Sequence, residues 1–543
     1  MSKIIKYFLF SFGFVIVGLL VGFKIKGSIP GSALSHIDSG VEKIQQTLLF
    51  IENNYVEEPN HQKLVDDAIN GLLEGLDPHS FYIPSNEMKQ MAEQLEGSFD
   101  GIGIQFDIVE DTIYVETPIP GGPSEKLGIM AGDRIVTVDG ETVAGININN
   151  ADVTRYLKGP KGTKVKVGIL RRGYAELLQF TIERDRIPIN SVDYAYMMDD
   201  KTGYIRVTRF AETTYSEFRQ KLADLKEQGL ESLILDLRSN PGGYMNMAYK
   251  IADEFLESGK VIVTTEGRIP QSRQEYQATK SLSMMEEGAL VILIDYGSAS
   301  ASEIVSGAVQ DHDRGLVMGV RSFGKGLVQV QERFEDGSAI RIVISRYYTP
   351  SGRCIQKPYD KTSEEYEKDI AQRFASGEIF DESKITFPDS LKFKTTGGRT
   401  VYGGGGIYPD VFAADDTSGN SKYFTDLRIE DMFRKFSFDY VDPRPEMKTK
   451  YPDARTFIRK FKTTPALVKT FTKYAASKGV NFVEADYQTS KRYIDNRIKA
   501  YIGRRIFNDE AFFPILHETD KVLQTALDYI PKAKKLEETG RLD

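Results

Sequence analysis

The stretch ALVILIDYGSASASEIVSGAVQD, residues 289–311, decides the fold expected for the centre of this chain. An apolar run over 290–294 is followed by small residues and then by a helical pattern over 303–310. Ser300 would therefore lie where a strand turns into the N-terminus of a helix. The amide of Ala301 has no partner within such a helix, and the helix dipole favours a developing anion beside it. Ser300 is thus a candidate nucleophile, with helix capping as the alternative role of the serines.

A lysine 25 residues further on supports the nucleophile. Lys325 lies in the turn SFGKG, before an alternating stretch, 327–334, that turns at 336–337 and resumes over 339–348. This pattern predicts a β-hairpin. A lysine acts as a base near neutral pH only where burial lowers its pKa from the reference value of about 10.4. Gln329 follows four residues later, on the same face if the strand begins at the lysine, and is placed to orient the amine.

No spacing in the sequence proposes a histidine base. Of the five histidines, His312 is nearest to Ser300, twelve residues along the same predicted helix. At about 1.5 Å per residue the two would lie roughly 18 Å apart, too far for a hydrogen bond. We therefore expect a serine–lysine pair rather than a Ser-His-Asp triad.

Eight segments, in the same order along about residues 40–415, resemble the C-terminal processing peptidases, also called tail-specific proteases. They are YVEEPNHQKLVDDAINGLLEGLDPHSFYIP (55–84), GSFDGIGI (97–104), PSEKLGIMAGDRIVTVDG (123–140), LILDLRSNPGGY (233–244), GSASASEIVSGAVQD (297–311), FGKGLVQ (323–329), YYTPSGRCIQ (347–356) and GIYPDV (406–411). The resemblance implies that Ser300 is the nucleophile, that Lys325 is the base and that Gln329 completes a triad.

The resemblance also implies an oxyanion hole. It would combine the amide of Ala301 with a glycine of the NPGG loop, which we assign to Gly243, with Gly242 as the alternative. The LILDL segment before this loop has the pattern of a buried parallel strand, and a loop at its carboxyl end can direct a backbone amide. An ordinary strand-to-helix turn is the alternative for this loop.

The expected fold is α/β and α+β, in several domains, because 543 residues exceed one hydrophobic core. Five apolar strands alternate with helical patterns, which favours a mainly parallel sheet: GYIRV, LILDL, VIVTT, ALVILID and GLVMG. The resemblance implies a ClpP/crotonase-like α/β peptidase core with an inserted PDZ domain and helical flanks. We divide the chain into a signal-anchor transmembrane segment (1–26), a linker and helical region (27–95), the PDZ domain (96–186), the peptidase core (187–415, with an insertion of unknown role at 359–400) and a helical C-terminal domain (416–543).

The region 96–186 resembles a PDZ domain that captures the end of a peptide chain. One loop resembles the site whose backbone amides receive a terminal carboxylate while a strand edge pairs with the peptide. This loop consists of Gly101, Ile102, Gly103 and Ile104. By analogy, Arg155 and Lys158 are expected to contact the peptidase core and to couple tail binding to activity.

The N-terminal residues predict a membrane anchor. Seventeen mostly apolar residues, 7–23, lie between two pairs of lysines. This length is at the short end of a membrane span and exceeds a usual signal-peptide core. We expect an uncleaved anchor; a signal peptide cleaved near 31–33 is the alternative. The resemblance implies export, with the catalytic body in the bacterial periplasm, anchored at the inner membrane or released if the segment is cleaved.

A helical seam follows, with apolar residues spaced 4-3-4-3-4 from Ile37 to Tyr55. This seam packs either within its own domain or at a subunit interface, and the sequence leaves both roles open. The resemblance implies a homodimer. A higher homo-oligomer and binding to an adaptor protein are further possibilities. The net charge of −8 and the lack of a polybasic run give no reason to expect nucleic acid. A single cysteine, Cys354, excludes an intrachain disulfide, and neither a metal cluster nor a cofactor is expected.

Two functions from different classes follow. The first is a serine endopeptidase that binds C-terminal tails of exported proteins through its PDZ domain and cleaves through an acyl-enzyme. The second is a membrane-tethered PDZ scaffold with an inert protease-like domain. The intact set of Ser300, Lys325 and Gln329 favours the enzyme.

Overall fold

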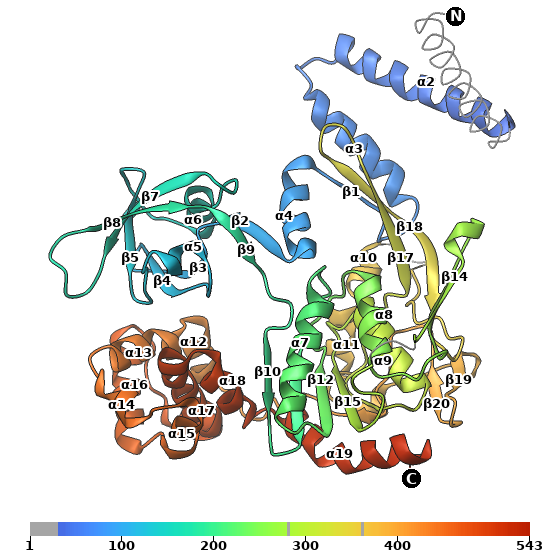
Figure 1. Ribbon diagram of the computed structural model, residues 1–543. Coiled ribbons are helices and arrows are strands. Elements are labelled where there is room, and N and C mark those ends of the chain that lie inside the picture. The colour runs from blue at the N-terminus through green and yellow to red at the C-terminus, as the bar shows by residue number, and fades with distance from the viewer. Residues whose placement is uncertain (1–30, 280–282, 360–362, 543) are drawn as a thin grey trace, which may run out of the picture. The chain divides into compact units, whose positions relative to one another are not determined.

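The computed structural model describes residues 31–279, 283–359 and 363–542 (Figure 1). Its internal contacts divide it into two units, one ending at Pro84 and the other beginning at Ser85. The first unit holds helices α2 (Gly31–Asn54) and α3 (His61–Glu74) and strand β1 (Phe81–Ile83). The predicted seam is therefore helical. The predicted membrane segment lies outside the described residues, and among the described helices none combines the length and apolarity that a membrane span requires.

The second unit begins with α4 (Ser85–Glu96) and continues into the region predicted as a PDZ domain. A two-stranded ribbon of β2 and β9 joins the ends of this region. Between them lies a sheet in the order β3-β4-β5-β7-β8, with β6 on β5. The elements are β2 (Ser98–Gly101), β3 (Ile104–Val109), β4 (Thr112–Pro118), α5 (Pro123–Lys126), β5 (Arg134–Val138), β6 (Glu141–Thr142), α6 (Asn150–Leu157), β7 (Lys164–Leu170), β8 (Leu178–Glu183) and β9 (Asp185–Pro188).

A second sheet forms the centre of the predicted peptidase core, in the order β10-β11-β12-β15-β16-β21. Only the β10–β11 pair is antiparallel, so the predicted mainly parallel sheet is present. Its strands are β10 (Tyr194–Met197), β11 (Thr202–Arg206), β12 (Ser232–Asp236), β15 (Ala289–Ile294), β16 (Leu316–Gly319) and β21 (Val411–Phe412). The helices between them are α7 (Thr214–Glu227), α8 (Met245–Asp253) and α9 (Ala301–Asp311).

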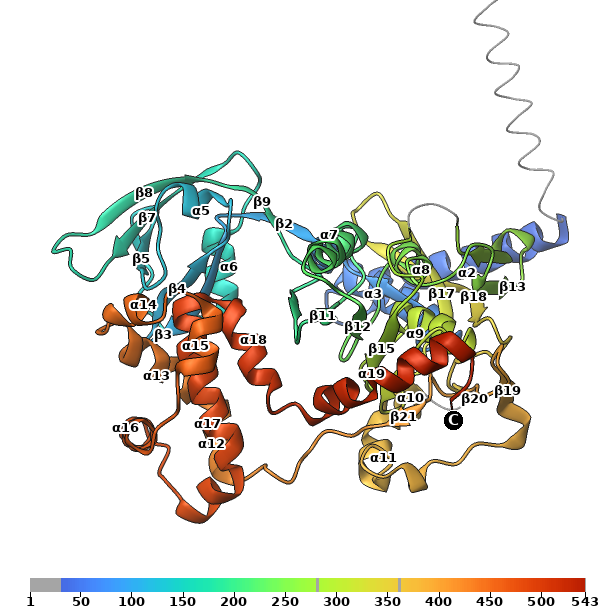
Figure 2. The same ribbon diagram turned by 60° about the horizontal axis from the view of Figure 1, so that its bottom comes forward.

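Both faces of this sheet are covered, which explains its continuous apolar strands. Alternate strand residues such as Leu235 and Ile292 pack into a core with α7, α8 and α9. Their neighbours, such as Ile234 and Val291, face the opposite side and pack against α19 (Lys521–Thr539). Figure 2 brings α19 to the front of that face. The expected division placed α19 in the C-terminal domain, but its apolar stripe belongs to the peptidase core.

The prediction that VIVTT joins the parallel sheet is wrong. This segment is β13 (Val261–Gly267), which pairs antiparallel with β14 (Gln274–Gln277) and with β18. Strand β12 pairs directly with β15 and leaves no place for β13 between them. The pattern of an apolar run predicts a strand but not the sheet that the strand joins.

The predicted hairpin is confirmed as β17 (Leu327–Arg333) and β18 (Ala339–Tyr348), which pair antiparallel. At its turn, Asp336 accepts hydrogen bonds from the amide and hydroxyl of Ser338, at 2.9 and 2.6 Å. Gly337 has a φ of 87°, a conformation that glycine adopts without strain.

Short elements follow the hairpin, and a helical domain precedes α19. The short elements are α10 (Ser363–Glu367), α11 (Asp369–Ser376), 3-10 turns at Glu382–Lys384 and Asp389–Leu391, β19 (Lys392–Lys394) and β20 (Thr400–Tyr402); another 3-10 turn, Pro270–Ser272, precedes β14. The helical domain comprises α12 (Lys422–Ile429), α13 (Met432–Val441), α14 (Glu446–Lys450), α15 (Ala454–Lys460), α16 (Pro465–Ser477), α17 (Glu484–Phe507) and α18 (Asp509–His517). It has its own aromatic-rich core, which confirms the predicted helical character.

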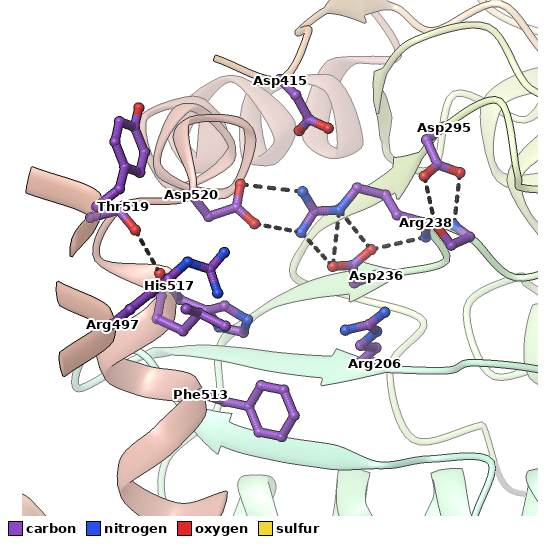
Figure 3. A pocket seen from close by; sticks show the side chains of 13 residues that line it. Arg206, Asp236, Arg238, Asp295, Asp415, Arg497, Phe513, His517, Thr519 and Asp520 are labelled. Atoms are coloured by element: carbon purple, nitrogen blue, oxygen red, sulfur yellow. Dashed lines mark hydrogen bonds and ion pairs between the residues drawn. The ribbon is translucent and has the colours of Figure 1, made fainter. Parts of the chain in front are cut away.

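A pocket with many charged side chains lies where α18 and α19 meet the central sheet (Figure 3). Arg238 lies between two carboxylates, with Nη2 at 2.6 Å from Asp236 and 2.8 Å from Asp520. His517 is buried beside them, and its Nδ1 lies 2.9 Å from the hydroxyl of Tyr196. Burial lowers the pKa of His517 to about 4, although Asp520 and Asp236 oppose the shift.

His517 is expected to make the fold less stable in mild acid. The unfolded chain protonates this histidine near pH 6.5 and the folded chain only near pH 4, so the unfolded state binds the extra proton in this window. Its contribution of about 3 kcal/mol is complete above pH 6.5 and is lost as the pH falls to 4. Urea unfolding at pH 7, 5.5 and 4 should show a smaller pH dependence for His517→Asn than for the parent. The exposed His61→Asn variant is the control, and equal slopes for all three proteins would contradict the prediction.

Candidate active site

Ser300 lies in the turn between β15 and α9, as the sequence predicts, and is half-buried. Its backbone has φ 55° and ψ −110°, a combination that non-glycine residues rarely adopt. Such strain persists only where the surroundings hold it. Here the amide of Ser300 donates to Glu303 Oε2 at 2.8 Å, and the preceding amide, that of Ala299, donates to the Asn240 carbonyl at 3.0 Å.

The buried carboxylate of Glu303 joins the nucleophile turn to the lysine turn. Besides Ser300, its Oε2 accepts the amide of Lys325 at 2.9 Å, and its Oε1 accepts the amide of Gly324 at 2.7 Å and the hydroxyl of Ser322 at 2.5 Å. Burial raises the pKa of Glu303, and these four hydrogen bonds oppose the shift. Four donors converge on two oxygens, which suits an ionised carboxylate.

Tyr347 makes a second link between the two turns. Its hydroxyl donates to the carbonyl of Lys325 at 2.7 Å and lies 3.0 Å from the carbonyl of Ser300. Burial raises the pKa of Tyr347 well above its usual value, so the phenol stays protonated and able to donate. Glu303 and Tyr347 together fix the backbone of Ser300 and Lys325 relative to each other.

The amine of Lys325 donates to Oε1 of Gln329 at 2.8 Å, so the expected contact is present. The strand that carries Gln329 begins at Leu327, two residues after the lysine, which corrects the assumption that it begins at Lys325. A register irregularity between Val328 and Gln329 accompanies this contact. The structure thus brings the two side chains together, and their catalytic roles stay predictions.

The NPGG loop lies directly against the nucleophile turn. A Cβ atom on Gly242 would lie 2.8 Å from the Cβ of Ser300 and 3.0 Å from the amide nitrogen of Ala301. A Cβ atom on Gly243 would lie 2.2 Å from the Phe210 carbonyl oxygen. Both positions therefore require glycine. The amide of Gly242 donates to Asn240 Oδ1 at 2.9 Å, which favours Gly243 over Gly242 as the oxyanion donor beside Ala301.

Comparison with known proteins identifies the family. Residues 201–366 match peptidase family S41, residues 114–171 match a PDZ domain, and residues 28–87 match the N-terminal domain of the activating protease CtpB. The carboxy-terminal-processing protease of Bartonella bacilliformis is 38% identical over 310 residues, which cover 56% of this chain and 70% of that protein. The chain belongs to peptidase family S41. It is a serine-type peptidase with a PDZ domain, and the predicted fold class and resemblance are confirmed.

Three further matches are found for this chain. The carboxy-terminal processing protease CtpA of Bacillus subtilis is 35% identical to the S41 peptidase described here over 321 residues, 59% of this chain and 67% of that protein. The solved structure of a photosystem II D1 C-terminal processing protease is 30% identical and covers 57% of this chain and 82% of that chain, with a TM-score of 0.32. Residues 423–508 match a family of unknown function, DUF8443.

The predicted tail-binding loop of this S41 peptidase leads into an edge strand. The carbonyl of Ile102 accepts the amide and the hydroxyl of Ser124, at 3.1 and 2.6 Å, and the carbonyl of Gly103 accepts the amide of Ile119 at 3.0 Å. Gly103 has a φ of 74°, which suits glycine. Ile104 then begins β3, which pairs with β4 and lies at the end of the sheet order. A strand at a sheet edge is able to pair with a peptide.

The two basic residues near the exit of the PDZ domain have other partners than the expected ones. Arg155 bonds to Asp152 of its own helix, and Lys158 bonds to Glu93 of α4 at 2.7 Å. In the described residues both ion pairs therefore lie outside the peptidase core, and the coupling of tail binding to activity stays a prediction. Position along the chain alone does not determine which charged group a basic side chain meets.

Histidine plays no part in the described site of this S41 peptidase. His312 lies at the C-terminal end of α9, and its Nε2 is 2.6 Å from the carbonyl of Val261. Among the described residues, no group of three or more His, Cys, Asp and Glu side chains is arranged to hold a metal ion.

Periodicity and motif spacing did not identify Glu303 and Tyr347 as part of the site. The spacing of Ser300 and Glu303 could have identified Glu303. In a helix that begins with Ser-x-x-Glu, the glutamate side chain accepts the backbone amide of the serine. Tyr347 follows Lys325 by 22 residues, and no local pattern links the two.

Proposed function

We propose that this peptidase cleaves peptide bonds with Ser300 as nucleophile and Lys325 as general base. The observation that carries the proposal is the shared network in which Glu303 and Tyr347 each bond to both residues. It joins a helix N-terminus, suited to an oxyanion, to a lysine whose amine is oriented by Gln329.

The reaction proceeds in two halves. The neutral amine of Lys325 takes the hydroxyl proton of Ser300 as its Oγ attacks the substrate carbonyl, and the amides of Ala301 and Gly243 stabilise the oxyanion. The lysine ammonium then protonates the leaving amine, so the peptide bond breaks and an ester forms on Ser300. A water molecule gives a proton to the lysine and attacks the ester, and the serine recovers its proton as the new carboxyl terminus leaves.

The proposed substrates are C-terminal tails of exported proteins, bound by the PDZ domain. The loop from Gly101 to Ile104 precedes the edge strand β3, which supports capture of a terminal carboxylate by strand addition. Relatives named carboxy-terminal processing proteases support the same specificity.

Cleavage is expected to depend on a free C-terminus. Two unfolded reporter proteins of identical sequence, one with a free apolar C-terminus and one with an amidated C-terminus, would be incubated with the full chain. Mass spectrometry should show at least about tenfold faster cleavage of the free form, because the amide cannot reproduce a carboxylate in an amide-lined loop. Equal rates would contradict tail recognition, and binding of the free tail without any cleavage would favour the inert scaffold.

Membrane anchoring at residues 7–23, with the body in the periplasm, stays part of this proposal. It rests on the apolar run and its flanking lysines. Fractionation of expressing cells, followed by protease treatment of spheroplasts, would test it: a protein that is soluble in the cytoplasmic fraction would contradict it.

Self-association through the first unit is the proposed assembly. Along α2, the side chains of Val41 and Ile44 belong to the predicted seam and are exposed by 58% and 44% in the single chain. A regular apolar face of this kind fits a second copy of the same helix. Sedimentation analysis should show a dimer that Ile44→Asp dissociates, whereas an unchanged distribution would contradict the interface.

A further inference from the structure

The insertion 359–400 packs against the turn that carries Lys325. Arg373 of α11 is buried, with 3% of its surface exposed. Its Nη1 donates to the carbonyl of Ser322 at 2.8 Å, and its Nη2 donates to the carbonyl of Phe323 at 3.3 Å. One guanidinium therefore holds two consecutive carbonyls that lie just before the catalytic lysine.

The same guanidinium is anchored within the insertion. Its Nη2 lies 2.9 Å from Asp369, one helical turn earlier. The amine of Lys357 lies 3.2 Å from the same Asp369 oxygen, and it also lies 4.1 Å from the ring centroid of Phe323 and 3.9 Å from that of Tyr366. Both cations are thus paired with Asp369. The ring of Phe323, which belongs to the turn, packs against the amine of Lys357.

Other groups of the turn are also held by residues after the hairpin. Arg321 forms two hydrogen bonds with Glu378, at 2.6 and 2.8 Å. The amide of Lys357 donates to the carbonyl of Gly324, and the amide of Gly326 donates to Gln356 Oε1, both at 2.9 Å. Four residues therefore bond to Arg321, Ser322, Phe323, Gly324 and Gly326 of this turn: Gln356, Lys357, Arg373 and Glu378. The backbone of Lys325 itself is held from the nucleophile side, by Glu303 and Tyr347.

This turn has no helix or sheet ladder to satisfy its carbonyls before Leu327, so another donor must do so. A planar guanidinium suits two adjacent carbonyls, and its charge strengthens both bonds. A lysine at the same place presents one point charge and would hold only one carbonyl well. Small displacements of a catalytic base are costly, since a shift of about 1 Å can lower the rate about 100-fold.

We propose that Arg373 is a positioning residue for the catalytic base, and that the insertion 359–400 supports the turn of Lys325 from outside. The proposal rests on the proposed function, in which Lys325 is the base. Arg373 does not touch substrate; it fixes the backbone from which the lysine amine reaches Ser300.

The test compares Arg373→Ala and Arg373→Lys with a matched control in the full chain. The control is Arg399→Ala, which removes another arginine of the insertion that is paired with Asp313 and Asp410 and bonds to Gln310 at the far end of α9. For cleavage of the free-tail reporter, Arg373→Ala should lower kcat about 100-fold and change KM less than about threefold. The kcat of Arg373→Lys should be about tenfold lower than that of the parent. Arg399→Ala should keep kcat within about threefold of the parent, even with a lower Tm.

Chemical rescue separates positioning from general damage. Added guanidinium ion should restore part of the kcat of Arg373→Ala, and it should leave the parent and Arg399→Ala without gain. If Arg373→Ala does not fold, Arg373→Lys decides: a kcat equal to that of the parent overturns the proposal. The proposal is also overturned if Arg373→Ala keeps the kcat of the parent. It is overturned as well if Arg399→Ala loses as much kcat as Arg373→Ala does and guanidinium restores no kcat to Arg373→Ala. Two other results would instead overturn the proposed function. Either the parent chain does not cleave the reporter, or the Lys325→Ala variant cleaves it as fast as the parent does.

Discussion

Replacing Ser300 by alanine is expected to lower kcat/KM for the free-tail reporter by about 10⁴-fold or more, the scale seen when a serine peptidase loses its nucleophile. The alanine has no oxygen to form the acyl-enzyme, and the bonds that Ser300 makes through its backbone to Glu303 and Tyr347 remain. The fold should therefore be retained, which circular dichroism and an unchanged Tm within a few degrees would show.

Ser306→Ala is the matched control for that experiment. Ser306 lies in the same helix, and its hydroxyl donates to the carbonyl of Ser302 at 2.8 Å. It should keep parental activity. A fluorophosphonate should label the parent and Ser306→Ala at residue 300 and leave Ser300→Ala unlabelled at that position. Parental cleavage by Ser300→Ala would show that another residue is the nucleophile.

Replacing Lys325 by alanine is expected to lower kcat by about 10³-fold, within the range that a general base contributes. Lys325→Arg should lose about as much, because a guanidinium keeps the positive charge but cannot give up its proton near neutral pH. The Lys325→Arg variant therefore separates proton transfer from a simple electrostatic role, because arginine preserves the positive charge but cannot act as the base. Steady-state kinetics with the same reporter would measure both.

Lys394→Ala is the control for the lysine variants. Lys394 is exposed on β19, where its amine donates to the hydroxyl of Thr400. It should keep parental kcat. Full activity in Lys325→Arg would contradict the role of the lysine as base, and slower fluorophosphonate labelling of Ser300 in Lys325→Ala would support it.

Local patterns predicted a large part of this molecule. The strand, turn and helix around Ser300 and the hairpin after Lys325 follow from residue periodicity and from turn residues such as Asp336 and Gly337. These are short-range features, so the sequence carries them within a few residues. The family likewise follows from motifs that occur in order along the chain.

Other features depend on residues that meet only in the folded chain. Strand β13 has the same apolar pattern as its neighbours, yet it joins a different sheet, because β12 and β15 already pair with each other. Helix α19 belongs to the peptidase core because its apolar stripe covers the second face of the central sheet. No local pattern specifies which surface an apolar stripe will cover.

The sequence by itself predicted the chemistry of this protein: residue types in local patterns point to Ser300 and Lys325, and the family resemblance adds the glycine loop and the PDZ domain. Only the tertiary structure decided how that chemistry is held in place. Glu303 and Tyr347 bond to both turns, and Arg373 reaches the same turn from an insertion 48 residues beyond the lysine. Hydrogen bonds between distant residues leave no periodic trace in a sequence, because each bond depends on where the intervening chain places its two ends.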